Sequence, residues 1–156
     1  MDIKEYPAFG PLAHEHKPLF DHVFKENPPQ ISEFTFTNLF AWRDVYALSF
    51  CRFEGFYIFR SDSLQGARFF PPIGTGAVKK AVEKILRDSK GSCIRFPEAQ
   101  ASLFVHDSRF ECSLDEDNSD YLFNCQDLIS LSGRRYDGKR NLIKKFKSSH
   151  SYDYEM

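Results

Sequence analysis

The stretch YALSFCRFEGFYIFR, residues 46–60, decides the fold class of this chain. It contains two runs rich in strand-forming apolar and aromatic residues, Tyr46 to Phe53 and Phe56 to Arg60, separated by Glu54-Gly55. Two such runs around a short glycine-containing turn are typical of an antiparallel hairpin. The sequence therefore predicts that a sheet begins here.

Two helices are predicted before the hairpin. Residues 17–25 place Leu19, Phe20, Val23 and Phe24 on one side of a helix, and the sequence Asn27-Pro28-Pro29 ends it. Ser32 is predicted to open a second helix that continues to about Arg43. Both segments would lay an apolar side against the sheet.

The elements predicted after the hairpin alternate between extended and helical. The most regular is a helix from Thr75 to Asp88, with apolar residues at helical spacing. The other predicted elements are an extended piece (67–70), strands (93–96, 110–114 and 121–124), a short helix (98–105) and a segment (126–131) that leads into a basic helix (133–148). With neither repeat nor linker, residues 1–156 are expected to form one α+β unit, with helices against a mostly antiparallel sheet of five to seven strands.

Composition narrows the class of protein. The chain has 156 residues, which suits one domain, and its 17 phenylalanines predict a core built largely from rings. No run approaches the roughly 20 apolar residues of a membrane span, and the first residues lack the apolar region of a secretory signal. The four cysteines (Cys51, Cys93, Cys112 and Cys125) are scattered, so reduced, packed thiols and a cytoplasmic location are expected.

Charge is segregated along the chain. Residues 134–147 carry seven cations and one anion, Asp137, whereas the other 142 residues have a net charge of −7. A cationic segment attached to an acidic domain predicts either a phosphate-bearing partner or a surface that meets another domain.

Projected on a helix, this basic segment is amphipathic. Tyr136, Leu142, Ile143 and Phe146 share one arc of about 120°. The cationic side contains Arg140, Lys144 and Lys147, while Arg135 and Lys139 fall inside the apolar arc. Two interpretations remain open: Arg135 and Lys139 extend to water from a plain surface helix, or they lie half-buried at a cleft and hold an anion. Ser132 is the predicted N-cap, and Gly138 should cost this helix about 1 kcal/mol relative to alanine.

A second candidate phosphate site is the turn containing Gly74 and Gly76. The segment FPPIGTGA, residues 70–77, predicts a strand, a glycine turn and a helix start, where free N–H groups can hold a phosphate. It lacks the lysine of a P-loop and the full dinucleotide-binding spacing, so a plain strand-to-helix turn is the stronger interpretation.

Other chemistry has little support. His14, His16 and His22 lack an obvious fourth ligand, and residues 115–120 lack the glycine and glutamate of a calcium loop, so no metal is predicted and the acidic stretch is expected to be a solvated hairpin turn. No His and carboxylate are placed beside a Ser or Cys nucleophile. The catalytic residues, including any general base, therefore stay unassigned from the sequence.

Several short motifs occur together in one order. They are SEFTFTNLFAWR (32–43), FPPIG (70–74), DYLF (120–123), LSG (131–133) followed by Tyr136, KRN (139–141) and KF (145–146). Together, over roughly residues 15–152, they resemble a family of uncharacterised bacterial proteins related to the C-terminal catalytic domain of phosphatidylglycerol lysyltransferases. The resemblance implies a GNAT-like acyltransferase fold with two such units in tandem, of which this chain matches the N-terminal half.

The resemblance also implies a function and partners. Relatives move an aminoacyl group from a charged tRNA to a lipid head group, so acyl-CoA or aminoacyl-tRNA is the expected donor, and tRNA, acyl-CoA or an anionic lipid head group the expected partner. The basic helix is where the resemblance and the charge pattern converge, so the candidate substrate-binding residues are Arg135, Lys139, Arg140, Asn141 and Lys144, with Gly74 and Gly76 as phosphate contacts from the turn pattern. Trp42 and Tyr136 are candidate stacking surfaces, although packing in the core is the stronger interpretation of each.

Three functional hypotheses follow. The first is half of a cytosolic acyl- or aminoacyl-transferase, which could also act peripherally at a membrane. The second is a non-catalytic interaction module or truncated remnant that pairs with a second GNAT-like unit or with its own copy. The third, a nucleic-acid binder without catalysis, ranks last because the formal net charge is only −1.

Overall fold

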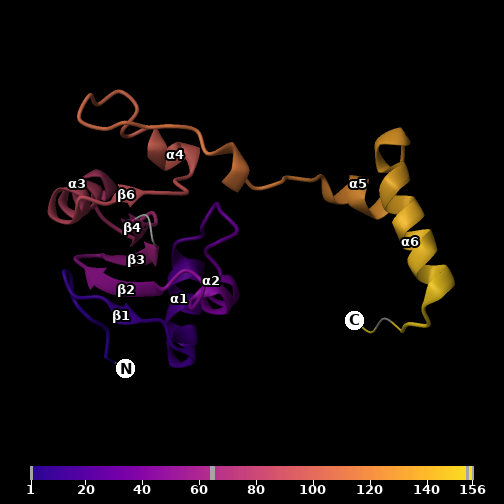
Figure 1. Cartoon of the computed structure of the whole chain (residues 1–156), viewed down its shortest axis with the longest axis horizontal. Helices are drawn as coiled ribbons and strands as arrows, with labels where there is room; N and C mark the ends of the chain where they lie inside the picture. Colours follow the sequence, from indigo (N-terminus) through magenta and orange to yellow (C-terminus); the bar gives the residue numbers. More distant parts are fainter. Residues whose placement is uncertain (1, 64–65, 154, 156) are drawn as a thin grey trace. The chain divides into compact units, whose positions relative to one another are not determined.

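The computed structural model describes residues 2–63, 66–153 and 155 (Figure 1). The chain divides into two compact units, residues 1–120 and residues 121–156. The first unit contains the sheet and most of the buried side chains, and the second is helical. Each unit is described in turn.

The first unit is built on a mixed sheet, as predicted. Within the described residues it has six strands in the order β1-β2-β3-β4-β6, with β5 also paired to β3. The strands are β1 (Gly10–Pro11), β2 (Leu48–Phe53), β3 (Phe56–Ser63), β4 (Gly66–Phe69), β5 (Ile73–Gly74) and β6 (Ser92–Cys93). All pairs are antiparallel except β4 with β6. The predicted α+β class is therefore confirmed, and the arrangement is consistent with a single GNAT-like unit.

The predicted hairpin is the centre of this sheet. Strands β2 and β3 pair along their whole shared length, from Leu48 opposite Ser61 to Phe53 opposite Phe56. Glu54 takes a left-handed φ of 51°, which closes the two-residue turn. Gly55 is required at the next position, because a Cβ there would lie 2.2 Å from the carbonyl oxygen of Thr75.

Helices lie against both faces of the sheet. The helical elements of the first unit are η1 (His14–His16), α1 (Lys17–Glu26), α2 (Phe36–Trp42), α3 (Val78–Ser89), α4 (Glu98–Ala101) and η2 (Glu116–Asn118). Residues of α1 and α2 pack with Phe50 and Phe59 in one buried cluster. Residues of α3 pack with Cys51 and Ile58 in the other. Successive strand residues point to opposite faces, so one hairpin supplies both clusters.

The first cluster is a network of rings, as the composition predicts. Phe20 of α1 is fully buried, and its ring centre lies 5.1 Å from that of Phe50, 5.5 Å from that of Tyr57 and 5.0 Å from that of Phe59. Tilted and edge-to-face contacts at such distances add to the free energy gained by burying the rings. Phe20 thereby fixes α1 on the face of the sheet that also receives α2.

Several predicted elements are wrong. Residues 110–114 and 121–124 form no strand, and their exposed side chains, such as Leu114 at 80% and Leu122 at 95%, show that no neighbouring strand covers them. Short apolar runs do not by themselves reveal whether a pairing partner exists. Residues 115–120 consequently join no hairpin and contain the 3-10 turn η2 instead.

The start of α2 is also corrected. Thr35, not Ser32, caps the helix by accepting a hydrogen bond from the Asn38 N–H at 3.1 Å. Ser32 does not cap the helix; its N–H and its hydroxyl both donate to the Asp120 carboxylate instead. A long-range partner has replaced the local one.

The second unit contains α5 (Cys125–Ser130), the 3-10 turn η3 (Arg134–Tyr136) and α6 (Asp137–Ser149). The predicted basic helix is thus present from residue 137, but Ser132 does not cap it: Gly133 precedes η3 with φ of 87°, and Tyr136 is the N-cap of α6. Among the described residues of this unit, Tyr136 is the buried hydrophobic side chain, with 6% exposed. No helix in the described ranges is both long and apolar enough to cross a membrane.

The cysteines differ in environment. Cys51 is buried and Cys93 partly buried, whereas Cys112 and Cys125 are exposed, so the prediction of packed thiols holds only for the first two. All four are unpaired. Burial raises the pKa of the Cys51 and Cys93 thiols to about 12, because a thiolate is poorly solvated among apolar side chains.

We expect two of the four thiols to react rapidly with a disulfide reagent at pH 8 in the native protein. Cys112 and Cys125 are accessible, while the raised pKa and burial of Cys51 and Cys93 suppress thiolate formation. Absorbance after addition of Ellman's reagent counts the thiols, and the same assay in 6 M guanidinium, a concentration that unfolds ordinary domains, should count four. Four fast thiols without denaturant would contradict the packing of β2 and β6.

Candidate functional site

The predicted anion-binding cations lie in the second unit and differ in whether they already pair with an acidic side chain. Arg135 is exposed, forms an ion pair with the Asp127 carboxylate and places its guanidinium carbon 4.8 Å from the ring centre of Tyr136. Lys139 is also exposed, with Nζ 5.4 Å from the ring centre of Phe123. Neither is half-buried, so the arrangement matches side chains that extend to water.

Arg140 stabilises the connection between α5 and α6. Its Nη1 donates to the carbonyl oxygens of Leu131 and of Gly133, the latter at 3.0 Å, and its Nη2 pairs with Asp137. α5 ends at Leu131, which has a left-handed φ of 47°, and the carbonyls at the end of a helix lack intrahelical donors. Arg140 supplies those donors, and its charge is shared with Asp137.

The free positive charge is concentrated further along α6. Lys144, Lys145 and Lys147 are exposed, and no acidic partner for them exists within the part of the chain that the structure describes. Asn141 is exposed on the same helix. The apolar arc of α6 is also uncovered: Leu142 is 70% exposed, Ile143 44% and Phe146 48%.

Gly74 and Gly76 belong to the first unit and have structural reasons to be glycine. Gly74 has φ of 139°, and a Cβ there would lie 2.1 Å from the Gly55 carbonyl oxygen. Gly76 has φ of 147°, and a Cβ there would meet the Phe56 ring at 2.8 Å. The N–H of Thr75, between these two glycines, donates to the carbonyl oxygen of Gly55 at 3.2 Å. These glycines let β5 close on the hairpin turn, and their phosphate role stays a prediction.

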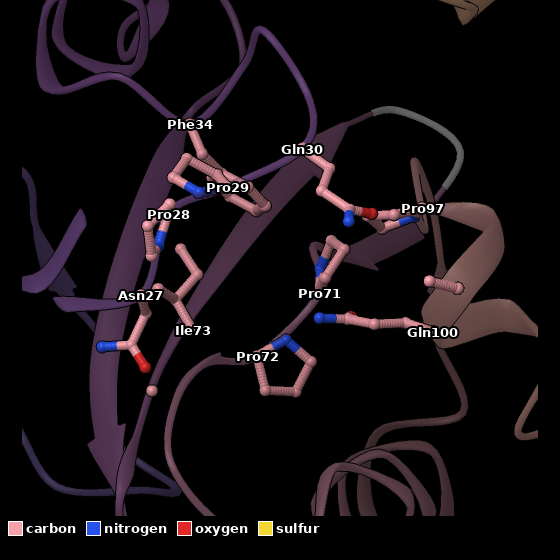
Figure 2. A pocket seen from close by; sticks show the side chains of 12 residues that line it. Asn27, Pro28, Pro29, Gln30, Phe34, Pro71, Pro72, Ile73, Pro97 and Gln100 are labelled. Carbon is pink, nitrogen blue, oxygen red and sulfur yellow. The ribbon is translucent and has the colours of Figure 1, made fainter. Parts of the chain in front are cut away.

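A proline-lined cleft of about 260 Å³ lies in the first unit (Figure 2). Its walls come from the segment after α1, the segment between β4 and β5, and the start of α4; they include Pro28, Pro29, Pro71, Pro72 and Pro97. Figure 2 shows the Gln100 side chain extending from α4 toward Pro71. Its Oε1 is buried, with no hydrogen-bond partner among the described residues.

A second hollow of about 190 Å³, which we call the Trp42 cup, lies beside α2. It is lined by Glu33, Asn38, Leu39, Trp42, Tyr46, Leu48, Phe70 and Arg95. It combines an aromatic wall with a charged pair, since Arg95 and Glu33 form an ion pair at 2.5 Å. The cup therefore has the mixture of apolar surface and convergent polar groups that ligand sites share.

Long-range hydrogen bonds hold this region together. The N–H and hydroxyl of Ser32 donate to the two oxygens of Asp120 at 2.9 and 2.6 Å, and Arg95 donates through Nη2 to Asn118 at 3.2 Å. The hydroxyl bond, followed by the backbone bond, lowers the pKa of Asp120 below its ordinary value. Residues 32–33 are thereby fixed against residues 95 and 118–120, far apart in the sequence.

The sequence indicates only part of the Trp42 cup. Trp42 was predicted to offer a stacking surface, and it does lie half-exposed on the cup wall, whereas the Tyr136 ring is packed with only 6% exposed. Glu33 and Asp120 belong to the motifs at 32–43 and 120–123, but the sequence assigns neither residue a role. Arg95 lies inside the predicted strand 93–96, and a strand pattern does not indicate a binding site. Among the described residues, no group of three or more His, Cys, Asp or Glu side chains is placed to hold a metal ion.

These observations define an α+β domain with a largely antiparallel sheet, a cup beside α2 and a separate basic helical unit. The chain belongs to the phosphatidylglycerol lysyltransferase C-terminal family, whose model matches residues 24–156.

A solved structure has the same fold. It is the crystal structure of a conserved protein of unknown function from Bacteroides thetaiotaomicron, similar with a TM-score of 0.74 and 22% sequence identity over 90% of this chain. The match covers 50% of that protein, so the present chain spans about half of its length. No curated protein matches.

We expect Ser32→Ala to destabilise the first unit in a pH-dependent way. The lowered pKa of Asp120 means that its ionised form is favoured in the folded state, so this contribution is complete above pH 3.8 and is lost as pH falls through the lower folded-state pKa. At pH 7 the variant should lose about 0.5 kcal/mol, since the contact is exposed, and the difference from the parent should shrink below pH 3.8.

Denaturant unfolding at pH 7 and at about pH 3 measures this difference. Ser119→Ala is the matched control, because the Ser119 hydroxyl donates to a backbone carbonyl and not to a carboxylate. An equal loss for Ser32→Ala at both pH values would contradict the role of the Asp120 charge.

Proposed function

We propose that this chain is one half of an acyl- or aminoacyl-transferase that acts on a phosphate-bearing donor or acceptor at the cytoplasmic side of the cell. The family match over residues 24–156 supports transferase chemistry. The proposal of a phosphate-bearing substrate rests on one observation about α6. Its Lys144, Lys145 and Lys147 are exposed and lack acidic partners within the described ranges.

The physical argument concerns which cations can still bind. Arg135 and Arg140 already share their charge with Asp127 and Asp137. Lys139, Lys144, Lys145 and Lys147 are exposed and keep a full charge, because the ring beside Lys139 does not neutralise it. Such a cluster attracts phosphates of tRNA, of a CoA-type donor or of anionic lipid head groups, and salt weakens that attraction.

The exposed apolar arc of α6 fits a peripheral membrane role in the same proposal. Leu142, Ile143 and Phe146 would enter the head-group region while the lysines meet anionic lipid. In this arrangement the helix brings the transferase half to a phosphate-bearing acceptor.

We expect Lys144→Glu combined with Lys147→Glu to weaken binding of tRNA, coenzyme A or phosphatidylglycerol vesicles at least about tenfold, because like charges then repel the phosphates. For tRNA, the double variant should also show a shallower dependence of log affinity on log salt, by about 0.7 to 0.9 for each phosphate that the helix no longer neutralises. Fluorescence anisotropy and vesicle co-sedimentation over a salt series provide both quantities.

Lys25→Glu with Lys80→Glu is the matched control. Both residues are exposed in the first unit, and the change in total charge is identical. Equal weakening by the control would indicate attraction by overall charge, and unchanged binding by the α6 variant would remove these lysines from the proposal.

A second candidate function, pairing with another α+β unit, is favoured by the apolar surface of the second unit. Its exposed apolar side chains include Leu128 (42%), Ile129 (75%) and Leu142 (70%). Units below about 40 residues seldom bury enough surface to be stable without a partner. The structural relative has twice the matched length, so its remaining half is a natural model for such a partner.

If the partner is a second copy, we expect Leu142→Asp to convert a dimer into a monomer, because a charge would be buried in the apolar contact. Light scattering during size-exclusion chromatography measures the mass. Lys145→Asp, a change on the same helix outside the apolar arc, should leave the dimer intact. A parent chain that is monomeric at high concentration would rule out self-pairing and leave a separate unit as the partner.

A further inference from the structure

We propose that the Trp42 cup binds a purine base that carries an exocyclic amino group, with the base stacked on Trp42 and its amino edge directed at Glu33 and Asn38. Nothing in the family match assigns a ligand to these residues. The proposal goes beyond the proposed function, because a nucleobase site in the first unit requires neither transfer chemistry nor the charge of α6.

The aromatic wall is suited to stacking. Trp42 is 48% exposed, and its ring centre lies 5.8 Å from that of Tyr46 with an angle of 31° between the rings. Asn38 and Trp42 are four residues apart on α2, so they occupy the same helix face. Trp42 and Tyr46 both line the cup, so the half-exposed indole offers aromatic surface to a planar ligand, and stacking on aromatic side chains is a common way to hold a base.

The polar side of the cup is held in place before any ligand arrives. The side chains of Arg95 and Glu33 are only 16% and 17% exposed and meet at 2.5 Å through Nη1 and Oε1. Arg95 also donates to Asn118, and its guanidinium carbon lies 5.7 Å from the Tyr46 ring centre and 5.8 Å from that of Phe70. Glu33 is therefore oriented by a residue that is itself fixed on several sides.

Unused hydrogen-bonding capacity remains at the cup. The described residues offer no partner for the second carboxylate oxygen of Glu33 or for the side-chain amide of Asn38. The first is an acceptor, and the second provides both a donor and an acceptor. A ligand that fits needs an N–H donor beside an acceptor on one planar edge.

The backbone of Arg95 is a second sign of a site. Arg95 has φ of 56°, a left-handed conformation that is unfavourable for a residue with a long side chain. Such conformations persist only where the surroundings enforce them, and they cluster at ligand-binding positions. Here the left-handed residue is the one whose guanidinium lies near the Tyr46 and Phe70 rings and pairs with Glu33.

These features select the ligand class. Adenine presents an amino donor next to a ring-nitrogen acceptor, the pattern that asparagine side chains pair with in nucleic acids. Its amino group can donate to Glu33, and its ring nitrogen can accept from the Asn38 amide. A bare phosphate does not fit, because Glu33 already neutralises Arg95 and would repel an anion.

The size of the cup limits what enters. About 190 Å³ is smaller than typical small-molecule pockets of about 300–1,000 Å³, so the cup holds one ring system, and sugar and phosphate groups would stay outside. The base could belong to a free nucleotide or to an unpaired nucleotide at the end of an RNA. The shared chemistry is the amino-bearing purine.

Residues 1–156 contain a single tryptophan, so their intrinsic tryptophan fluorescence reports directly on the cup. We expect adenosine to quench this fluorescence saturably. Purine riboside, which is adenosine without its amino group, should bind about tenfold more weakly, as expected when one hydrogen bond to a charged group is removed. Ribose 5-phosphate should have no effect. Quenching by ribose 5-phosphate as strong as by adenosine, or no saturable quenching by adenosine, would overturn the proposal.

Variants locate the site without disturbing the ion pair. Asn38→Leu should weaken adenosine binding about tenfold, since it removes the amide contact while keeping a side chain of similar size. Trp42→Leu should abolish binding measured by calorimetry. Val45→Ala is the control: Val45 is 70% exposed close to the cup in sequence and does not line it, so binding should be retained. Unchanged binding in both Asn38→Leu and Trp42→Leu would place the base elsewhere and refute the assignment.

Two further affinity comparisons identify the molecule that carries the base. Coenzyme A binding more tightly than adenosine assigns the cup to a nucleotide ligand. A single-stranded RNA ending in adenosine that binds more tightly than the same RNA ending in uridine assigns it to an RNA end. The Lys144→Glu, Lys147→Glu variant should keep quenching by adenosine, so a failure of the α6 proposal remains distinguishable from a failure of this one.

Discussion

The pairing of β2 with β3 is the constraint on which the first unit depends. Alternate residues of this hairpin face opposite sides of the sheet. Phe50 and Phe59 therefore pack with α1 and α2 on one face, and Cys51 and Ile58 pack with α3 on the other. The turn can close only because Gly55 and Gly74 approach each other without side chains. Strand β5 and the start of α3 are thereby placed at the same end of the hairpin.

The Trp42 cup depends on that arrangement and on one additional contact. Packing of α2 on the sheet sets Trp42 and Asn38 at the surface, and the Glu33–Arg95 ion pair then ties the chain before α2 to the chain after β6. The Ser32–Asp120 bonds hold the same region from the other end. Two partly buried charges need pairing and further hydrogen bonds to offset their desolvation; Arg95 pairs with Glu33 and also donates to Asn118, while Glu33 keeps one oxygen without a partner among the described residues.

The two units differ in physical character. The first buries a ring-rich core, and the second leaves most of its apolar side chains in water while concentrating the unpaired lysines of α6. The uncovered apolar arc and the cationic side of α6 are the features on which the proposed partner, whether lipid, nucleic acid or protein, depends. That contrast is the physical basis for treating the first unit as the scaffold of a small-molecule site and the second as a surface for a larger partner.

Periodicity and turn chemistry are local properties, so the sequence was enough to predict the α+β class, a hairpin over residues 46–60, the helices that became α1, α3 and α6, and the segregation of charge. The tertiary structure alone decided that residues 110–114 and 121–124 are not strands, since a strand exists only where another chain segment pairs with it. It alone also assembled Glu33, Trp42 and Arg95 into a cup. These residues lie up to 62 positions apart, and no local pattern records a contact that folding creates.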